Sequence, residues 1–276
     1  MDAGPSSSRA ARVDTYDIYN QDDTPTPRRS RSPVGRGASS IDQSSVEVPL
    51  TIQSLLTKGI AELRDDRTSS YCIRMPLTIG PVLLDTWKSA LMGLDWQRPT
   101  TQGGGQLPRQ TIWMANCDCP YAYGGVVIPA IPFNELLIEI TTLVFETLDM
   151  PLPNACNLNL YTHGTQQVGW HDDSETLFAS EDTRIISLSL GATRTFEIVA
   201  KEKLKKIKKN FKFATKSADA NDIIPVELSQ GDLLIMAGRM QQHYEHRLPP
   251  DVTQEPRINL TWRYITQHYS GCLKNN

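Results

Sequence analysis

One run near the carboxyl end, Arg257-Ile258-Asn259-Leu260-Thr261-Trp262-Arg263, carries most of the information about the fold. In an extended strand successive side chains point to opposite faces, so both arginines share one face with Asn259 and Thr261. The apolar residues between them take the other face. Arginines inside a barrel need anionic partners, because an unpaired buried charge is strongly unfavourable. A dicarboxylate would supply two anions, since a planar guanidinium binds a carboxylate at two points.

Other short segments of the same kind surround this run. Alternating or apolar stretches separated by turn residues predict strands over 71–75, 156–162, 168–172, 184–190, 194–199, 223–228, 233–236, 244–248 and 258–266. Helical spacing predicts helices over 52–63, from Pro81 to Met92, and over 133–148. Helices first and many short strands later favour an α+β fold, with helices on one side of an antiparallel sandwich or barrel.

The composition fits a soluble globular chain with a polar tail. The chain has 276 residues, a formal net charge of -3 and 39% hydrophobic residues. Residues 1–47 almost lack large apolar side chains and predict a disordered tail, which leaves 48–276 as one folded domain. No apolar run approaches the roughly 20 residues of a membrane-spanning helix. The first residues lack the apolar core of a secretory signal, so we expect no such signal there. We also expect no membrane partner.

The five cysteines are odd in number and scattered, which does not predict a disulfide framework and favours a reducing compartment. Cys117-Asp118-Cys119 could form half of a metal site. No second Cys or His pair lies at zinc-finger spacing, so this pattern alone predicts no metal centre. His163 and His268 are expected to be exposed or capping imidazoles.

A second pattern predicts a catalytic metal. His171 and Asp173 stand two residues apart and would point to one face of a strand. An imidazole from the distant segment His243 to Arg247 would complete two histidines and one carboxylate. This set is the facial triad of non-haem Fe(II) oxygenases, and it leaves three metal positions open. His243 and His246 are three residues apart, so at most one of them would enter the barrel.

Further motifs occur in a fixed order along the chain. They are Pro108-Arg109-Gln110, Tyr121-Ala122-Tyr123-Gly124-Gly125, Asn159-Leu160-Tyr161, the stretch 187–194, the stretch 231–236 and Tyr244-Glu245-His246-Arg247-Leu248-Pro249. With the pattern His-x-Asp and the terminal run of arginines, residues 73 to 263 resemble the AlkB family of Fe(II)/2-oxoglutarate-dependent dioxygenases. The chain is most similar to the animal nucleic-acid demethylases of that family.

The resemblance implies a fold and a set of roles. It implies a double-stranded β-helix, or jelly roll, with N-terminal helices packed on one sheet. The matching iron ligands are His171, Asp173 and His246, where Arg247-Leu248-Pro249 favours His246 over His243. The matching 2-oxoglutarate contacts are Asn159, Tyr161, Arg257, Asn259 and Arg263. Tyr121 and Tyr123 match the aromatic edge of a base pocket, and Glu175 matches an acidic residue that reads an exocyclic nitrogen. Ser174 departs from the Asp that relatives often carry there, which concerns substrate choice.

The activity implied by the resemblance is oxidative demethylation of 1-methyladenine and 3-methylcytosine in DNA or RNA. Fe(II), 2-oxoglutarate and O2 would be used in DNA repair or RNA demethylation, with release of formaldehyde, succinate and CO2. Two alternatives use the same site: a hydroxylase of a protein or small molecule, and a non-catalytic binder of modified bases. We expect a monomer in the nucleus, the cytoplasm or both.

A lysine-rich segment between the strands that end near 199 and begin near 223 bears on the partner. Lys205, Lys206, Lys208 and Lys209 are predicted to grip phosphates, because lysines on a nucleic-acid backbone bind without sequence preference. The alternatives are a solvated hairpin insertion and an amphipathic helix on a partner or membrane surface.

Overall fold

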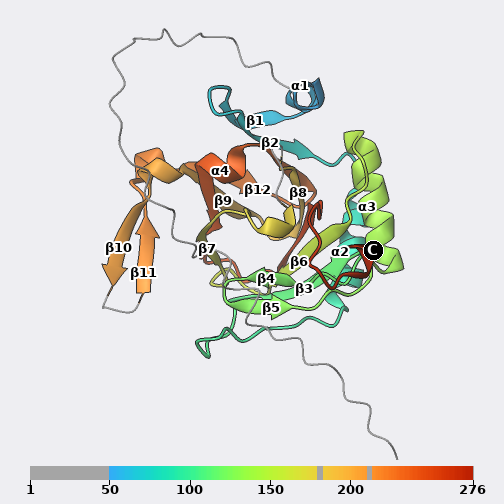
Figure 1. Ribbon diagram of the computed structural model, residues 1–276. Coiled ribbons are helices and arrows are strands. Elements are labelled where there is room, and N and C mark those ends of the chain that lie inside the picture. Colours follow the sequence, from blue (N-terminus) through green and yellow to red (C-terminus); the bar gives the residue numbers. More distant parts are fainter. Residues whose placement is uncertain (1–49, 179–182, 210–212, 276) are drawn as a thin grey trace, which may run out of the picture. The chain divides into compact units, whose positions relative to one another are not determined.

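A computed structural model describes residues 50–178, 183–209 and 213–275 (Figure 1). The tail predicted over 1–47 falls outside these ranges, so its boundary stays a prediction. Within the described ranges, no helix has the length and apolar character needed to cross a membrane.

The larger sheet is antiparallel and has seven strands in the order β1-β2-β13-β8-β15-β6-β3. Its strands are β1 (Ile60–Asp65), β2 (Ser70–Pro76), β13 (Asp232–Gly238), β8 (Ile185–Gly191), β15 (Arg257–Arg263), β6 (Ala155–Tyr161) and β3 (Gln110–Ala115). The arginine run is therefore strand β15, between β8 and β6. Its register sets Arg257 opposite Tyr161 and Asn259 opposite Asn159.

The smaller sheet is antiparallel and has the order β12-β9-β14-β7. It contains β12 (Ile224–Leu228), β9 (Arg194–Ala200), β14 (Tyr244–Leu248) and β7 (Val168–His171). In this sheet His246 of β14 lies opposite His171 of β7. From β6 to β9, and again from β13 to β15, successive strands alternate between the two sheets. That alternation is consistent with a jelly roll.

Two hairpins lie apart from these sheets. One pairs β4 (Tyr121–Tyr123) with β5 (Val126–Ile128), and the other pairs β10 (Lys205–Lys209) with β11 (Phe213–Ser217). Figure 1 shows the second hairpin projecting on the left of the view. Because 205–209 and 213–217 are strands, the amphipathic helix considered for this segment is wrong, and the hairpin insertion is confirmed.

The helices are α1 (Leu50–Lys58), α2 (Pro81–Met92), α3 (Glu135–Leu148) and the short α4 (Met240–His243). Buried side chains of α1, α2 and α3 share one hydrophobic cluster with the apolar residues of the larger sheet. In that cluster the Trp262 indole donates a hydrogen bond to Thr141 Oγ1 at 2.9 Å and meets the Phe145 ring edge-on. The apolar face of β15 is thus buried in this core, which leaves its polar face to line the site between the sheets.

Local signals explain the two longer helices. Pro81 sits in the first turn of α2, where its missing N–H has no partner to lose. Asn134 caps α3, because its side-chain oxygen accepts from the Leu137 amide at 2.8 Å. Asp149 ends α3 in the left-handed conformation, with φ of 55°.

The first predicted helix is too long. It ends at Lys58, and Ile60–Asp65 forms strand β1 instead. Gly59 lies so close to β2 that a Cβ there would stand 2.7 Å from Ile73 Cγ2 and 2.8 Å from the Arg74 carbonyl. Pairing with β2 therefore outweighs the helical spacing of Ile60 and Leu63. The sequence patterns also missed β3, β4 and β5.

Candidate active site

The predicted metal ligands meet between the two sheets. The ligand atoms of His171, Asp173 and His246 all lie within 4.8 Å of one another. Each histidine Nε2 is 3.8 Å from an oxygen of Asp173, and the two imidazole rings are 4.2 Å apart. His171 comes from the end of β7, and His246 faces it across the β14–β7 register. His243 lies in α4 instead and does not join the group.

Neighbouring groups hold these ligands in place. His171 Nδ1 lies 2.8 Å from the Gly169 carbonyl, so the ring can present Nε2 to a metal. The Asp173 amide donates to Gln241 Oε1 at 3.0 Å. Lys201 contacts Asp172 at 2.6 Å and donates to the Gln241 carbonyl at 2.8 Å, which ties the loop after β7 to α4. Neither Gln241 nor Lys201 was predicted, because their contacts depend on tertiary structure.

The protonation states suit a metal. Burial, and then the neighbouring His171, lowers the pKa of His246 to about 3, and burial also lowers the pKa of His171. Burial acts to raise the pKa of Asp173, but Arg263 and the two histidines hold that pKa below its usual range. Two neutral imidazoles and one carboxylate are the forms that bind a metal. Among the described residues Asp173 Oδ1 has no hydrogen-bond partner, which fits a ligand atom reserved for a metal.

Arg257 lies at the start of β15, at the opposite end of its polar face from Arg263. The side chain is buried, and burial lowers the pKa of Arg257 to about 10. Its Nη2 donates to Ser189 Oγ at 2.9 Å, and the guanidinium lies over the Tyr161 ring. Within the described part of the chain Arg257 faces no carboxylate, and its Nε has no partner. A buried guanidinium in that state fits the distal carboxylate of 2-oxoglutarate.

Arg263 marks the metal end of the same face. Its Nη2 lies 2.9 Å from Asp173 Oδ2, whereas its Nε and Nη1 have no partner in the described structure. Opposing burial, Asp173 raises the pKa of Arg263, so this guanidinium stays charged. Arg263 can therefore orient the metal-binding carboxylate and still face an anion beside the metal. The two arginines predicted to bind 2-oxoglutarate thus differ. Arg263 already pairs with Asp173, whereas Arg257 has no carboxylate partner among the described residues.

The asparagines lie between the two arginines. Asn259 accepts from Thr261 Oγ1 at 2.8 Å and donates to the Leu188 carbonyl. Asn159 Oδ1 accepts from Arg109 Nε at 2.6 Å. The same cavity is lined by all five predicted 2-oxoglutarate contacts, by the three predicted metal ligands and by Arg109. The sequence patterns gave Arg109 no role of its own. It is buried and lies over the Tyr123 ring, so it belongs to the site.

Aromatic rings line the cavity on the β4 side. Tyr121 stacks on Tyr123 with ring centroids 5.9 Å apart, and Tyr123 meets His171 edge-on at 5.7 Å. The Tyr121 hydroxyl donates to Glu175 Oε1 at 2.9 Å. Burial, with help from Asp173, raises the pKa of Glu175 to about 7. The predicted base-contacting residues therefore form one cluster beside the metal ligands. Trp170, which precedes His171, packs against the Arg247 guanidinium, whose central carbon lies 4.5 Å from the ring centroid.

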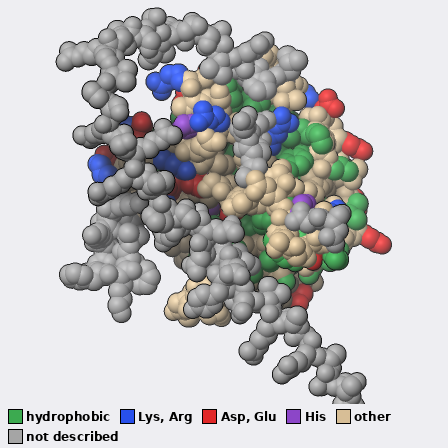
Figure 2. Space-filling model, viewed as in Figure 1, with side chains coloured by type: hydrophobic (Ala, Val, Ile, Leu, Met, Phe, Trp, Pro, Cys, Tyr) green, Lys and Arg blue, Asp and Glu red, His purple; other side chains and the backbone are tan. Residues whose placement is uncertain are grey.

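Several lysines of the predicted phosphate-binding segment and its surroundings pair with acidic side chains of the protein. Lys205 Nζ lies 3.0 Å from Asp219, Lys203 pairs with Asp222, and Lys216 bonds both oxygens of Glu245. The backbone of Lys206, Lys208 and Lys209 is in β10, and their side chains lie outside what the structure describes. On the face shown in Figure 2, Lys and Arg side chains lie on the side of this hairpin with acidic side chains among them, and further Asp and Glu side chains lie at the margin near α3.

The sequence of this chain is similar to a family of known enzymes. Residues 75–263 match the family model described as the 2OG-Fe(II) oxygenase superfamily. The chain belongs to this superfamily. Membership in it confirms the predicted enzyme class, an Fe(II)/2-oxoglutarate-dependent dioxygenase, and its two cofactors. The oxygenase has the donor set for both: two imidazoles and a carboxylate for Fe(II), and a buried arginine for the acid.

Curated relatives confirm the resemblance of this oxygenase to the AlkB family. The human protein "Alpha-ketoglutarate-dependent dioxygenase alkB homolog 3" is 31% identical over 164 residues, which are 58% of this chain and 52% of that protein. The Arabidopsis thaliana "DNA oxidative demethylase ALKBH2" is 27% identical over 62% of this chain and 59% of that protein. The chain thus spans about half the length of the curated relatives it matches. A solved structure described as "The structure of OsALKBH1" is 18% identical, covers 70% of this chain and 96% of that one, and has a TM-score of 0.44.

Proposed function

We propose that this oxygenase removes N-methyl groups from 1-methyladenine and 3-methylcytosine in DNA or RNA. The observation that carries the proposal is the Tyr121–Glu175 hydrogen bond beside the His171, Asp173 and His246 ligands. It puts an acid that can read an exocyclic amine next to aromatic rings and a metal site. The names of relatives such as the Arabidopsis demethylase support the same substrate class.

Each part of the site has a separate task in this proposal. Bound Fe(II) and 2-oxoglutarate supply the oxidising chemistry when O2 enters. Arg257 binds the distal carboxylate, and Arg263 fixes Asp173 toward the metal. Tyr121 and Tyr123 provide the stacking surface for a base. A base inside a duplex does not reach such a buried site, so it is presented flipped out or single-stranded.

The proposal includes the finer features of the fold and the setting. We assign the two sheets to a double-stranded β-helix whose N-terminal helices pack on the larger sheet, as their shared core supports. Lys206, Lys208 and Lys209 would contact phosphates, with Lys205 contributing when it leaves Asp219. We further propose a monomer that acts in the nucleus, the cytoplasm or both.

Mass spectrometry of short oligonucleotides tests the proposal. DNA and RNA strands that carry one 1-methyladenine are incubated with the full chain, Fe(II), ascorbate and 2-oxoglutarate. We expect loss of one methyl group, no loss without 2-oxoglutarate, and none with His171→Ala. Intact methyl groups together with succinate would contradict base demethylation and favour a hydroxylase of a protein or small molecule. Neither product from iron-loaded protein would favour a non-catalytic binder.

A further inference from the structure

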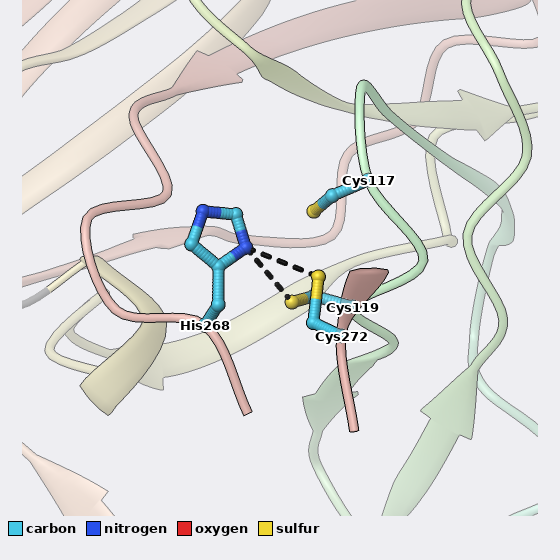
Figure 3. Close-up of side chains that lie close together, drawn as sticks. All are labelled: Cys117, Cys119, His268 and Cys272. Carbon is cyan, nitrogen blue, oxygen red and sulfur yellow. Dashed lines mark hydrogen bonds between the residues drawn. The ribbon is translucent and has the colours of Figure 1, made fainter. Parts of the chain in front are cut away.

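Four metal-binding side chains gather at a second place, outside the candidate active site. They are Cys117, Cys119, His268 and Cys272 (Figure 3). Their ligand atoms all lie within 4.8 Å of one another. Cys119 and Cys272 are buried, and all three cysteines are free thiols. The cluster joins the turn between β3 and β4 to the segment that follows β15.

The distances agree with a single bound ion. His268 Nδ1 lies 3.4 Å from Cys119 Sγ and 3.3 Å from Cys272 Sγ. Tetrahedral zinc, with bonds of about 2.3 Å to sulfur and about 2.0 Å to nitrogen, separates its nitrogen and sulfur ligands by about 3.5 Å. Nδ1 carries either one hydrogen or one lone pair, so it makes a well-directed hydrogen bond with only one of the two sulfurs, and the similar approach of both fits a shared ion better. Figure 3 shows the Cys117 sulfur beside the same group.

We propose that Cys117, Cys119, His268 and Cys272 bind a structural Zn²⁺ ion. Three thiolates and one imidazole form a closed set, because all four tetrahedral positions are taken by the protein and none is left for substrate. The ligand spacing is Cys-x-Cys followed, after a long interval, by His-x-x-x-Cys. This second site differs in donor type from the triad, since sulfur ligands favour zinc whereas carboxylate and imidazole with open positions suit Fe(II).

The contacts around the cluster indicate what the ion would support. Asp118, between the two cysteines of the turn, accepts from the Leu273 amide and from the Tyr269 hydroxyl, both at 3.2 Å. The Cys119 carbonyl accepts from the Trp113 indole at 2.9 Å, and the Trp113 ring stacks on Tyr121 at 4.8 Å. The ion would therefore anchor the carboxyl-terminal segment to the turn that leads into β4.

The same segment also supports the loop that carries Glu175. The Thr266 amide donates to the Leu177 carbonyl at 2.9 Å, and Leu177 lies in the 3-10 turn Thr176–Phe178. Buried Cys119, Phe178, Ile265 and Cys272 belong to one hydrophobic cluster with Tyr121. Loss of the ion would loosen the packing around Tyr121 and around the loop that carries Glu175. His171 on β7 and His246 on β14 would stay in place.

Metal analysis tests this proposal in the full chain. His171→Ala empties the triad, so that any zinc measured belongs to the cysteine cluster. We expect one zinc per chain in His171→Ala and none when Cys272→Ser is added. Cys72→Ala serves as the matched control, because Cys72 is a buried free thiol outside the cluster, and it should leave zinc at one per chain. Absence of zinc from His171→Ala protein made in zinc-supplemented medium, or its retention after Cys272→Ser, would overturn the proposal.

Cobalt substitution gives a second readout that does not alter the cluster. Co²⁺ added to metal-free His171→Ala protein should produce strong thiolate-to-cobalt absorption and the intense visible bands of a tetrahedral site. Zn²⁺ should bleach both. Weak bands without thiolate absorption would overturn the proposal even if Cys272→Ser failed to fold. Both readouts are independent of demethylation, so the zinc site and the proposed function can fail separately.

Discussion

The two metal-binding clusters of this protein are built in opposite ways. In the triad, His171 and His246 come from paired strands and Asp173 from the loop after β7, and the set offers three protein ligands with open metal positions. The cysteine cluster comes from a turn and a chain segment beyond the last strand, and it offers four ligands. An open set suits chemistry and a closed set suits structure. The comparison teaches that ligand number and donor type separate the two roles within one chain.

The largest expected effect is the loss of chemistry with one ligand of the triad. His171→Ala should reduce 2-oxoglutarate-dependent turnover to background while the far-ultraviolet circular dichroism stays unchanged. His163→Ala is the matched control, since the His163 ring bonds Thr165 outside the triad and the variant should retain activity. Turnover of His171→Ala at the wild-type rate would remove His171 from the triad.

The next effect separates the two arginines of β15. Arg257→Ala should raise the KM for 2-oxoglutarate by about 100-fold, or about 3 kcal/mol, because it removes a buried partner of a carboxylate. Arg257→Lys should recover part of this loss. Arg64→Ala, which breaks an exposed pair with Asp66, should leave the KM unchanged. An unchanged KM in steady-state kinetics of Arg257→Ala would contradict the assignment of the distal anion site.

A smaller effect concerns the support of the triad. Gln241→Ala removes the acceptor of the Asp173 amide and should weaken iron binding by about 10-fold to 100-fold. Equilibrium dialysis against Fe(II) under nitrogen measures the iron affinity of each variant. Gln242→Ala is the control, because Gln242 lies next in α4 and bonds Arg239 instead. Equal iron affinities of the two variants would show that Gln241 does not position the ligand.

The iron and zinc contents of one variant in each cluster test whether the two metal-binding clusters are independent. His171→Ala should lose iron and keep zinc, whereas Cys272→Ser should keep iron and lose zinc. Cys272→Ser should also lower the melting temperature by several degrees, since a loss of about 1 kcal/mol shifts Tm by about 2–4 °C in a domain of this size. Loss of both metals from both variants would show that the two clusters are not independent.

The smallest effect concerns the lysine hairpin. Replacing Lys206, Lys208 and Lys209 with Gln should weaken polynucleotide binding. The slope of log affinity against log salt should become shallower by about 0.7 for each single-strand phosphate that the variant no longer neutralises. Lys203→Gln is the control, because Lys203 pairs with Asp222. An unchanged salt slope in fluorescence anisotropy would exclude the hairpin as a phosphate-binding arm.

The sequence predicted what strand parity determines. Arg257, Asn259 and Arg263 share a face in any strand, so their position on the cavity wall follows from spacing alone. His246 was separable from His243 only through the residues after it. By contrast, the meeting of Cys119 with His268 depends on the path of the chain after β15. The spacing His-x-x-x-Cys was visible in the sequence, but nothing local pairs it with a turn about 150 residues earlier.

The other departures have the same origin. The helical spacing of Ile60 and Leu63 is real, but pairing of β1 with β2 determines the structure there. The lysine run predicted contacts with phosphates, yet Lys205 and Lys216 pair with Asp219 and Glu245, which tertiary folding brings to them. Local patterns therefore predicted the faces of strands well, and they did not predict partners that lie far apart along the chain.

The most direct test of base demethylation measures succinate and demethylated base in the same reaction. We predict one succinate for each 1-methyladenine repaired, with both products absent from His171→Ala. Succinate formed at the same rate with and without the methylated oligonucleotide, and no methyl group lost, would contradict it.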